Sequence, residues 1–279
     1  MVCGPTASGK SDLSDALAER LTQTYGLYAP TLVVDSMQVY EELPVITNQA
    51  RRRPAELVGI VPVTEEWTVA RHRQRAEEII EATETPFVLD IGTGMYLNAI
   101  ILDVPLAPKV SREIRTLAAE ISIAAQNPRR AVRAKELELA GAPDRGSIWE
   151  GNLRYDSTLI YLRPSRETLD AALAKRSEKI ARGGLEEAAN IKALAEGGAQ
   201  INPPVLDSIG VRELLEHLSG NLTLEEATSQ ITARTRQLAR RQLRWFDKLA
   251  RTLSGRTRRI TVAESPANID ISSIICMIE

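Results

Sequence analysis

The sequence contains few of the residues that define several classes of protein. Its 279 residues include two cysteines, Cys3 and Cys276, which stand at opposite ends of the chain. Two isolated cysteines argue against a disulfide framework and against a zinc knuckle. Aromatic residues make up only 4% of the chain. The core is therefore expected to be aliphatic, built of Leu, Ile, Val and Ala.

Long apolar runs are lacking as well, so we expect no membrane segment. Three residues precede the first glycine-rich motif, and we recognise no signal peptide. We therefore expect a cytoplasmic protein. We also expect it to be a monomer. With 43% hydrophobic and 26% charged residues, disorder is not expected. The length predicts one large or two modest domains.

The net charge of −2 hides an uneven distribution. Between Ser229 and Ile260 the only acid is Asp247, whereas ten residues are basic: Arg234, Arg236, Arg240, Arg241, Arg244, Lys248, Arg251, Arg256, Arg258 and Arg259. One strongly basic segment in a near-neutral chain indicates a local site for a polyanion.

The motif with the clearest chemical meaning lies at the start of the chain. It fits the phosphate-loop pattern G-x-x-x-x-G-K-[ST] and consists of Gly4, Pro5, Thr6, Ala7, Ser8, Gly9, Lys10 and Ser11. Its glycines let successive N–H groups point at an anion, its lysine supplies a charge, and its serine can hold Mg²⁺. Apolar residues at helical spacing follow it. The motif predicts binding of a phosphorylated ligand.

Strand and helix patterns alternate after this loop. Residues Thr31–Val34, Pro86–Leu89 and Ser157–Leu162 read as short buried strands, and residues 69–82 as a helix. This order predicts an α/β fold with a P-loop-type parallel sheet and helices on both faces. Ligands bind at the carboxyl ends of such strands. We therefore expect the loop, Asp35 and Thr93 to converge on one pocket.

The predicted core falls into two parts, residues 1–106 and 155–279. Residues 107–154 between them are rich in Ala and Arg and are predicted to form a small helical insertion domain. The second part is mostly helical and ends in a helix over about Leu224–Leu253. Its apolar face is expected to carry Ile231, Leu238, Trp245 and Leu249, and its opposite face Arg236, Arg240, Arg244 and Arg251.

Asp35 has three interpretations from its position after the second strand. It is a Mg²⁺ ligand opposite Ser11, a general base, or the cap of a following helix. Gln38 and Tyr40 lie close by in sequence and are candidates for hydrogen bonding or stacking with a nucleobase. Position alone does not choose among these possibilities.

Four separated segments together resemble the bacterial tRNA dimethylallyltransferases, which prenylate N6 of the adenosine next to the anticodon. The segments are GPTASGKS (4–11), DSMQVY (35–40), GTGMYLNA (92–99), and the pair SIGVREL (208–214) with RTRQLARRQLRWF (234–246). A generic kinase would share the first of these alone.

The resemblance implies that the phosphate loop holds the diphosphate of dimethylallyl diphosphate. Lys10, Ser11 and a bound Mg²⁺ would then stabilise the leaving diphosphate. Thr93 would hydrogen-bond it from the far side, and Arg112 from the insertion would help to neutralise it.

The resemblance also implies how the acceptor is bound. Asp35 would accept the N6 proton, and Ser36, Met37 and Gln38 would hold the flipped adenine of the tRNA anticodon stem-loop. Arginines would contact the tRNA phosphates, namely Arg129, Arg130, Arg133, Arg212, Arg236, Arg240, Arg241 and Arg244.

The chain departs from the family pattern in several places. Ile91-Gly92-Thr93 stands where the family usually has Gly-Gly-Thr, and the insertion is short. The histidine pair usual after the second motif is absent, and of the usual His-Pro-Asn-Asp before the R-x-x-R segment the chain has only Gln126-Asn127-Pro128. Three alternative functions remain open: prenylation of free adenine nucleotides, phosphorylation of a small molecule, and RNA binding without catalysis. The basic helix favours tRNA, because a free nucleotide would not require it.

Overall fold

The computed structural model describes residues 1–121, 128–142 and 147–276. The chain divides into two compact units. The first comprises Met1–Ile100 and Tyr155–Glu279, and the second Ile101–Arg154. The assignment of the second unit to tRNA contact stays a prediction.

The first unit is built on a five-stranded sheet in the order β2-β3-β1-β4-β5, and every neighbouring pair is parallel. The strands are β1 (Val2–Cys3), β2 (Thr31–Val34), β3 (Val88–Ile91), β4 (Thr158–Leu162) and β5 (Arg259–Ala263). Strands β1 to β4 are buried along their whole length. The predicted fold class is confirmed by this parallel sheet.

Two details of the strands differ from the prediction. Strand β3 continues through Asp90 to Ile91, so Asp90 lies inside the sheet and is 1% exposed. Strand β5 lies beyond the last predicted helix, in a stretch for which no strand was predicted. It lies at the edge of the sheet, with Arg259 and Val262 exposed. An edge strand has a neighbouring strand on one side only, so more of its residues face solvent and fewer of them need to be apolar.

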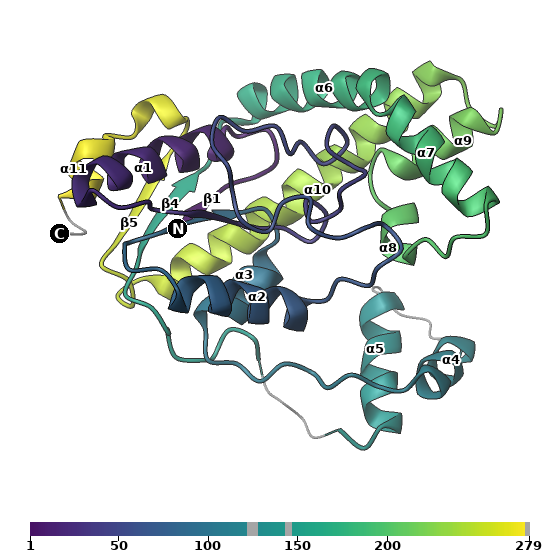
Figure 1. The fold of residues 1–279 in the computed structure, drawn as a ribbon, viewed down its shortest axis with the longest axis horizontal. Helices are drawn as coiled ribbons and strands as arrows, with labels where there is room; N and C mark the ends of the chain where they lie inside the picture. Colours follow the sequence, from purple (N-terminus) through teal and green to yellow (C-terminus); the bar gives the residue numbers. More distant parts are fainter. Residues whose placement is uncertain (122–127, 143–146, 277–279) are drawn as a thin grey trace. The chain divides into compact units, whose positions relative to one another are not determined.

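Helices cover both faces of the sheet (Figure 1). Helix α1 (Lys10–Tyr25) and the short α11 (Ile271–Ile275) lie on one face, while α2 (Val69–Glu81), α3 (Gly94–Ile101) and α10 (Leu224–Leu253) lie on the other. The core under α1 is aliphatic, with Leu13, Leu17 and Leu21 buried together with Ile274 and Ile275.

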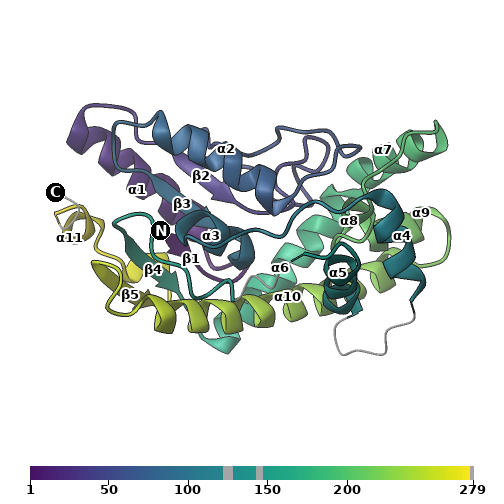
Figure 2. The same ribbon diagram turned by 90° about the horizontal axis from the view of Figure 1, so that it is seen from below.

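A helical part follows the fourth strand. It contains α6 (Arg166–Gly183), α7 (Leu185–Glu196), α8 (Pro203–Leu206) and α9 (Val211–Leu218). Helix α10 passes from α9 at one end to the sheet at the other (Figure 2). Its bounds match the predicted ones, and a capping box of Thr223 and Glu226 fixes its start.

The buried face of α10 is rotated from the predicted one. Ile231 and Leu249 are buried, but Leu238 and Trp245 are only half-buried. The buried stripe passes instead through Ala239, Gln242 and Phe246. The reason is the neighbouring α6, whose Leu169 and Leu173 pack against Ala239. A helix buries the face that its neighbours cover.

The second unit contains α4 (Arg112–Glu120) and α5 (Pro128–Leu139). Ser111 caps α4 by accepting a hydrogen bond from the Ile114 N–H group. Leu102 and Leu153 pair as a single antiparallel bridge where the unit begins and ends. Among the described residues of the whole chain, no helix is long and apolar enough to cross a membrane.

His72 of α2 is a fully buried titratable group. Its Nδ1 accepts a hydrogen bond of 3.0 Å from the Trp67 indole, and its ring lies 5.1 Å from that of Tyr96. Burial lowers the pKa of His72 to about 4. The neutral imidazole is therefore a structural part of this packing.

We expect the stability of the protein to fall on acidification because of His72. The unfolded chain takes up a proton near pH 6.5, whereas the folded protein resists it until about pH 4. Between pH 7.5 and 5 this difference removes about 2 kcal/mol of folding free energy. Urea unfolding at both pH values measures it, and the difference should shrink in His72→Gln. Equal pH dependence of this variant and the wild type would contradict the prediction, and His217→Gln is the matched control.

Candidate active site

The phosphate loop, residues Gly4–Ser11, connects β1 to α1. Ala7 and Gly9 have positive φ angles of 65° and 83°, which turn successive N–H groups toward one side of the loop. Within the described residues, the N–H groups of Gly9, Lys10 and Ser11 donate to no protein acceptor. These donors stand at the positive end of a 16-residue helix. The loop is therefore ready to bind an anion.

Lys10 supplies a buried cation at this loop. It is 9% exposed, and it forms no ion pair with any residue that the structure describes. Burial lowers the pKa of Lys10, and the carboxylates of Asp90 and Asp35 act against this shift. An anion bound in the loop could therefore pair with the Lys10 ammonium, which forms no ion pair with the described residues.

A buried ion-pair network lies under the loop and is centred on Arg51. Its Nη1 is 2.6 Å from Asp90 Oδ2, and its Nη2 is 2.7 Å from Asp15 Oδ1. All three side chains are at most 4% exposed. Nη2 also donates to the Ser11 carbonyl at 3.3 Å. The guanidinium thereby ties the first turn of α1 to β3.

Asp35 follows β2 and meets Thr93, which follows β3. Asp35 Oδ1 accepts the N–H groups of Met37 at 2.8 Å and Gln38 at 3.3 Å. Its Oδ2 is 3.4 Å from Thr93 Oγ1, which also accepts the Ser36 N–H at 3.2 Å. No helix begins within residues 36–68, all of which the structure describes, so the helix-cap interpretation is wrong. A local turn occupies Oδ1, and among the described residues Oδ2 has only the long contact with Thr93.

Glycine is required at position 92 by the carboxylate of Asp35. A Cβ atom on Gly92 would stand 2.0 Å from Asp35 Oδ2. The preceding position tolerates Ile91 because this side chain lies within β3 and is fully buried. The change from Gly-Gly-Thr to Ile-Gly-Thr therefore leaves the contact between Asp35 and the glycine intact.

Gln242 of α10 joins the phosphate loop to this motif. Its Oε1 accepts the Thr6 N–H group at 2.8 Å, and its Nε2 donates to the Gly92 carbonyl at 2.8 Å. These two partners lie far from Gln242 in sequence. The loop, the glycine motif and the basic helix thus meet at a single side chain.

The two nucleobase candidates behave differently. Tyr40 is 1% exposed, and its hydroxyl accepts a hydrogen bond of 2.6 Å from Asn202 Nδ2. Tyr40 is therefore a core residue, and the expectation that it stacks on a base is wrong. Gln38 instead has a buried Oε1 atom that accepts no hydrogen bond from any residue that the structure describes, so this oxygen is available to a donor on a ligand.

Comparison with known proteins decides the family. The sequence model of the IPP transferase family matches residues 38–249. The chain belongs to the IPP transferase family. The tRNA dimethylallyltransferase of Rubrobacter xylanophilus is 63% identical over 266 residues, which cover 95% of this chain and 91% of that relative. The enzyme of the same name from Thermobifida fusca is 34% identical, over 88% and 85% of the two chains. The family predicted from the four segments is confirmed.

Solved structures agree in fold. A eukaryotic dimethylallyltransferase acting on tRNA superposes with a TM-score of 0.72, at 23% identity, over 99% of this chain and 76% of that chain. The tRNA isopentenylpyrophosphate transferase of Bacillus halodurans gives a TM-score of 0.67 at 24% identity, over 99% and 92%. The IPP transferase chain therefore has the fold of these enzymes.

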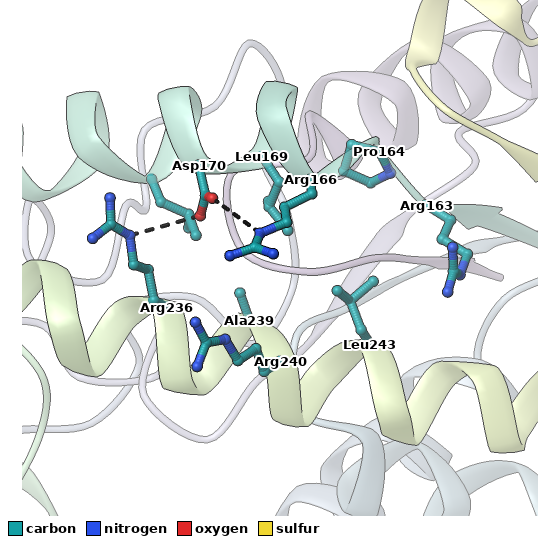
Figure 3. Close-up of a pocket in the computed structure, with 10 residues that line it drawn as sticks. Arg163, Pro164, Arg166, Leu169, Asp170, Arg236, Ala239, Arg240 and Leu243 are labelled. Carbon is teal, nitrogen blue, oxygen red and sulfur yellow. Dashed lines mark ion pairs between the residues drawn. The ribbon is translucent and has the colours of Figure 1, made fainter.

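The arginines predicted on α10 do not have one common environment. Arg236 and Arg240 line a pocket of about 370 Å³ between α6 and α10. In Figure 3, Arg166 and Arg236 both reach Asp170, at 3.7 and 3.6 Å. Arg241 and Arg244 are exposed further along the helix. Among the residues described, Arg240, Arg241 and Arg244 form no ion pair.

The other predicted arginines are partly engaged or lie beyond description. Arg133 of the second unit pairs with Glu136 at 2.5 Å and donates to the Pro108 carbonyl at 2.8 Å. Arg212 of α9 is 3.5 Å from Asp207. The predictions for Arg112, Arg129 and Arg130 concern side chains that lie outside the described residues.

Sequence reasoning missed three residues of this site. The charges of Arg176 in α6, Lys10 and Asp35 interact. Burial lowers the pKa of Arg176 and the Asp35 carboxylate opposes this shift, while Arg176 in turn lowers the pKa of Lys10. One sequence offers no signal that separates Arg176 from its basic neighbours, or Arg51 from Arg52 and Arg53. For Gln242 a signal existed, namely an amide in the apolar stripe of α10.

We expect Arg51→Met to destabilise the protein by about 3 to 5 kcal/mol, because it leaves two buried carboxylates without their cation. Urea unfolding measures the loss. The matched control is Arg52→Met, since Arg52 is 69% exposed and its contact with Asp12 is 3.8 Å. The control should change stability by less than about 1 kcal/mol. Similar losses in both variants would contradict a structural role of the buried network.

Proposed function

We propose that this protein is a tRNA dimethylallyltransferase. It transfers the dimethylallyl group of dimethylallyl diphosphate to N6 of adenosine 37 in tRNA and releases diphosphate. The observation that carries this proposal is the contact of Asp35 with Thr93 beside the phosphate loop, since it puts a candidate base next to an anion site. The 63% identical relative is named tRNA dimethylallyltransferase.

The leaving group is stabilised by the phosphate loop. The N–H groups of Gly9, Lys10 and Ser11 face the diphosphate, and the Lys10 ammonium balances its charge. Arg176 adds a second cation from α6. As the allylic carbon–oxygen bond breaks, its electron pair passes to the diphosphate, and these fixed donors stabilise the growing negative charge.

Asp35 removes the proton from the attacking nitrogen. N6 of the adenine forms the new bond to the allylic carbon, and its proton passes to Asp35. Oδ2 is the oxygen suited to this step, because the two N–H groups of the local turn already occupy Oδ1. An exocyclic amine is a weak nucleophile, so a carboxylate held beside it lowers the barrier.

The adenine is held by the residues after Asp35. The buried Oε1 of Gln38 has no donor in the part of the chain that the structure describes, and an N–H group of the base would supply one. Ser36 is fixed by Thr93 through a bond of 3.2 Å. The base must leave the tRNA stack to reach this site.

The donor atoms of the loop fit Mg²⁺. Ser11 offers a hydroxyl oxygen that forms no hydrogen bond within the described residues, and no group of three or more metal-ligating side chains occurs there. Mg²⁺ prefers such a site, since it takes a few protein oxygens together with phosphate and water. When bound, it would polarise the diphosphate and ease its departure.

The tRNA is bound through its phosphates by arginines. Arg240, Arg241 and Arg244 are suited to this role, because they are exposed and form no ion pair among the described residues. Phosphate contacts position an RNA without reading its sequence. The roles of Arg112, Arg129, Arg130, Arg133 and Arg212, the monomeric state and the cytoplasmic location stay predictions.

Incubation with labelled dimethylallyl diphosphate and either tRNA or AMP tests the function. We expect label in tRNA and not in AMP, and we expect Asp35→Asn to reduce its rate of appearance at least about 100-fold. The affinity of this variant for tRNA should stay within about twofold, and the exposed Asp12→Asn is the matched control. Label in AMP would establish the free-nucleotide enzyme. Transfer of phosphate from ATP would establish a kinase, and tRNA binding without transfer an RNA-binding protein.

Reversal of two charges on α10 should weaken tRNA binding. We expect Arg240→Glu with Arg244→Glu to raise the Kd for tRNA at least about tenfold. The slope of log Kd against log salt concentration should also fall, by the amount expected for the loss of about two phosphate contacts. A filter-binding series over salt concentration measures both. Arg20→Glu with Arg75→Glu makes the same change of net charge at exposed positions of α1 and α2. If this control weakens binding equally, α10 is not the tRNA surface.

A further inference from the structure

The buried stripe of α10 contains two polar residues, Thr235 and Gln242. The Thr235 hydroxyl donates to the Ile231 carbonyl of the same helix, whereas Gln242 bonds outside the helix. Ala239, Phe246 and Leu249 on the same face are at most 1% exposed, and Gln242 is 9% exposed. Burial of a side-chain amide is unfavourable unless its polar atoms are hydrogen-bonded. Both bonds of Gln242 run to backbone groups of other segments. A residue of this type at this place therefore fixes the distance between those segments.

The two partners belong to opposite sides of the proposed reaction. Thr6 lies in the phosphate loop, which binds the leaving diphosphate. Gly92 precedes Thr93, which contacts Asp35 Oδ2 at 3.4 Å and the Ser36 N–H at 3.2 Å. A chain of direct contacts thus runs from the leaving-group site through Gln242 to the base.

The two bonds also fix the orientation of the amide. The backbone N–H of Thr6 can only donate, so it faces Oε1, and the carbonyl of Gly92 can only accept, so it faces Nε2. A carboxylate at this position would keep the first bond and lose the second. The two bonds can therefore be tested separately.

We propose that Gln242 is a positioning residue for prenyl transfer, which sets the separation between the diphosphate in the phosphate loop and the carboxylate of Asp35. The proposal rests on the proposed function. Substitution at the allylic carbon needs the nitrogen, the carbon and the departing oxygen in one arrangement, and a displacement of about 1 Å costs about 100-fold in rate. Both polar atoms of Gln242 bond to protein backbone groups, so Gln242 acts through Thr6 and Gly92.

Three variants test the proposal. Gln242→Leu removes both bonds at similar volume. Gln242→Glu keeps the acceptor for Thr6 and places an oxygen against the Gly92 carbonyl. Gln237→Leu is the matched control, because Gln237 is exposed on the same helix. For each variant, kcat, the KM for tRNA, the affinity for inorganic pyrophosphate by calorimetry, and the melting temperature are measured.

We expect Gln242→Leu to lower kcat about 100-fold and to weaken pyrophosphate binding about tenfold, with the KM for tRNA within about twofold. Gln242→Glu should lower kcat at least about tenfold while its pyrophosphate affinity stays within about threefold. Gln237→Leu should match the wild type. If Gln242→Leu does not fold, Gln242→Glu decides alone.

The proposal is overturned if Gln242→Glu keeps the wild-type kcat, or if it loses pyrophosphate affinity without losing kcat. It is also overturned if Gln237→Leu shows the same losses. Because pyrophosphate binding is measured without prenyl transfer, its change reports on Gln242 even if the wild type modifies no tRNA. Failure of the proposed function would instead appear as absence of transfer by the wild type.

Discussion

The ion-pair network around Arg51 is the interaction on which the arrangement of the site depends. A guanidinium below the surface is tolerable only when carboxylates surround it, and Asp15 and Asp90 do so from α1 and β3. The phosphate loop leads into α1, and the Gly92-Thr93 motif follows β3. The network around Arg51 therefore fixes the position of the phosphate loop relative to this motif. Gln242 joins the same two segments from α10. The site is thus fixed from both faces of the sheet before any ligand binds.

This fixed arrangement explains how the protein can keep buried polar groups that lack an ion pair or a hydrogen bond. Lys10 is buried without an ion pair among the described residues, and Gln38 Oε1 and Ser8 Oγ are buried without partners. Each of these groups costs free energy in the unliganded protein. All three lie in the motifs that the proposed substrates would contact. A scaffold of satisfied bonds around Arg51 and Gln242 keeps such groups in place for ligands that complete them.

The sequence predicted strands β2, β3 and β4, the phosphate loop and the long helix α10 because each has a local signal. Buried strands read as short apolar runs, the loop has fixed spacing, and α10 has caps and a clear period. Strand β5 was missed because an edge strand can be half-exposed. Arg51 was missed because its two partners come from other elements, and three successive arginines offer no local reason to choose it. Tyr40 was misread for the same reason, since Asn202 decides its environment.

Helix α10 shows how one element can contribute to the binding of two substrates without a conformational change. Its buried stripe carries Gln242, which fixes the diphosphate loop, and its exposed side carries Arg240 and Arg244, which are suited to tRNA. Phe246, Leu249 and Leu253 are fully buried on the first side, so the helix is held along its C-terminal half. Binding of tRNA to the exposed arginines can then bring the acceptor to a site whose geometry already exists. On this view the binding energy of the tRNA is directed to flipping the adenine, and the separation of base and leaving group is set by the fold itself.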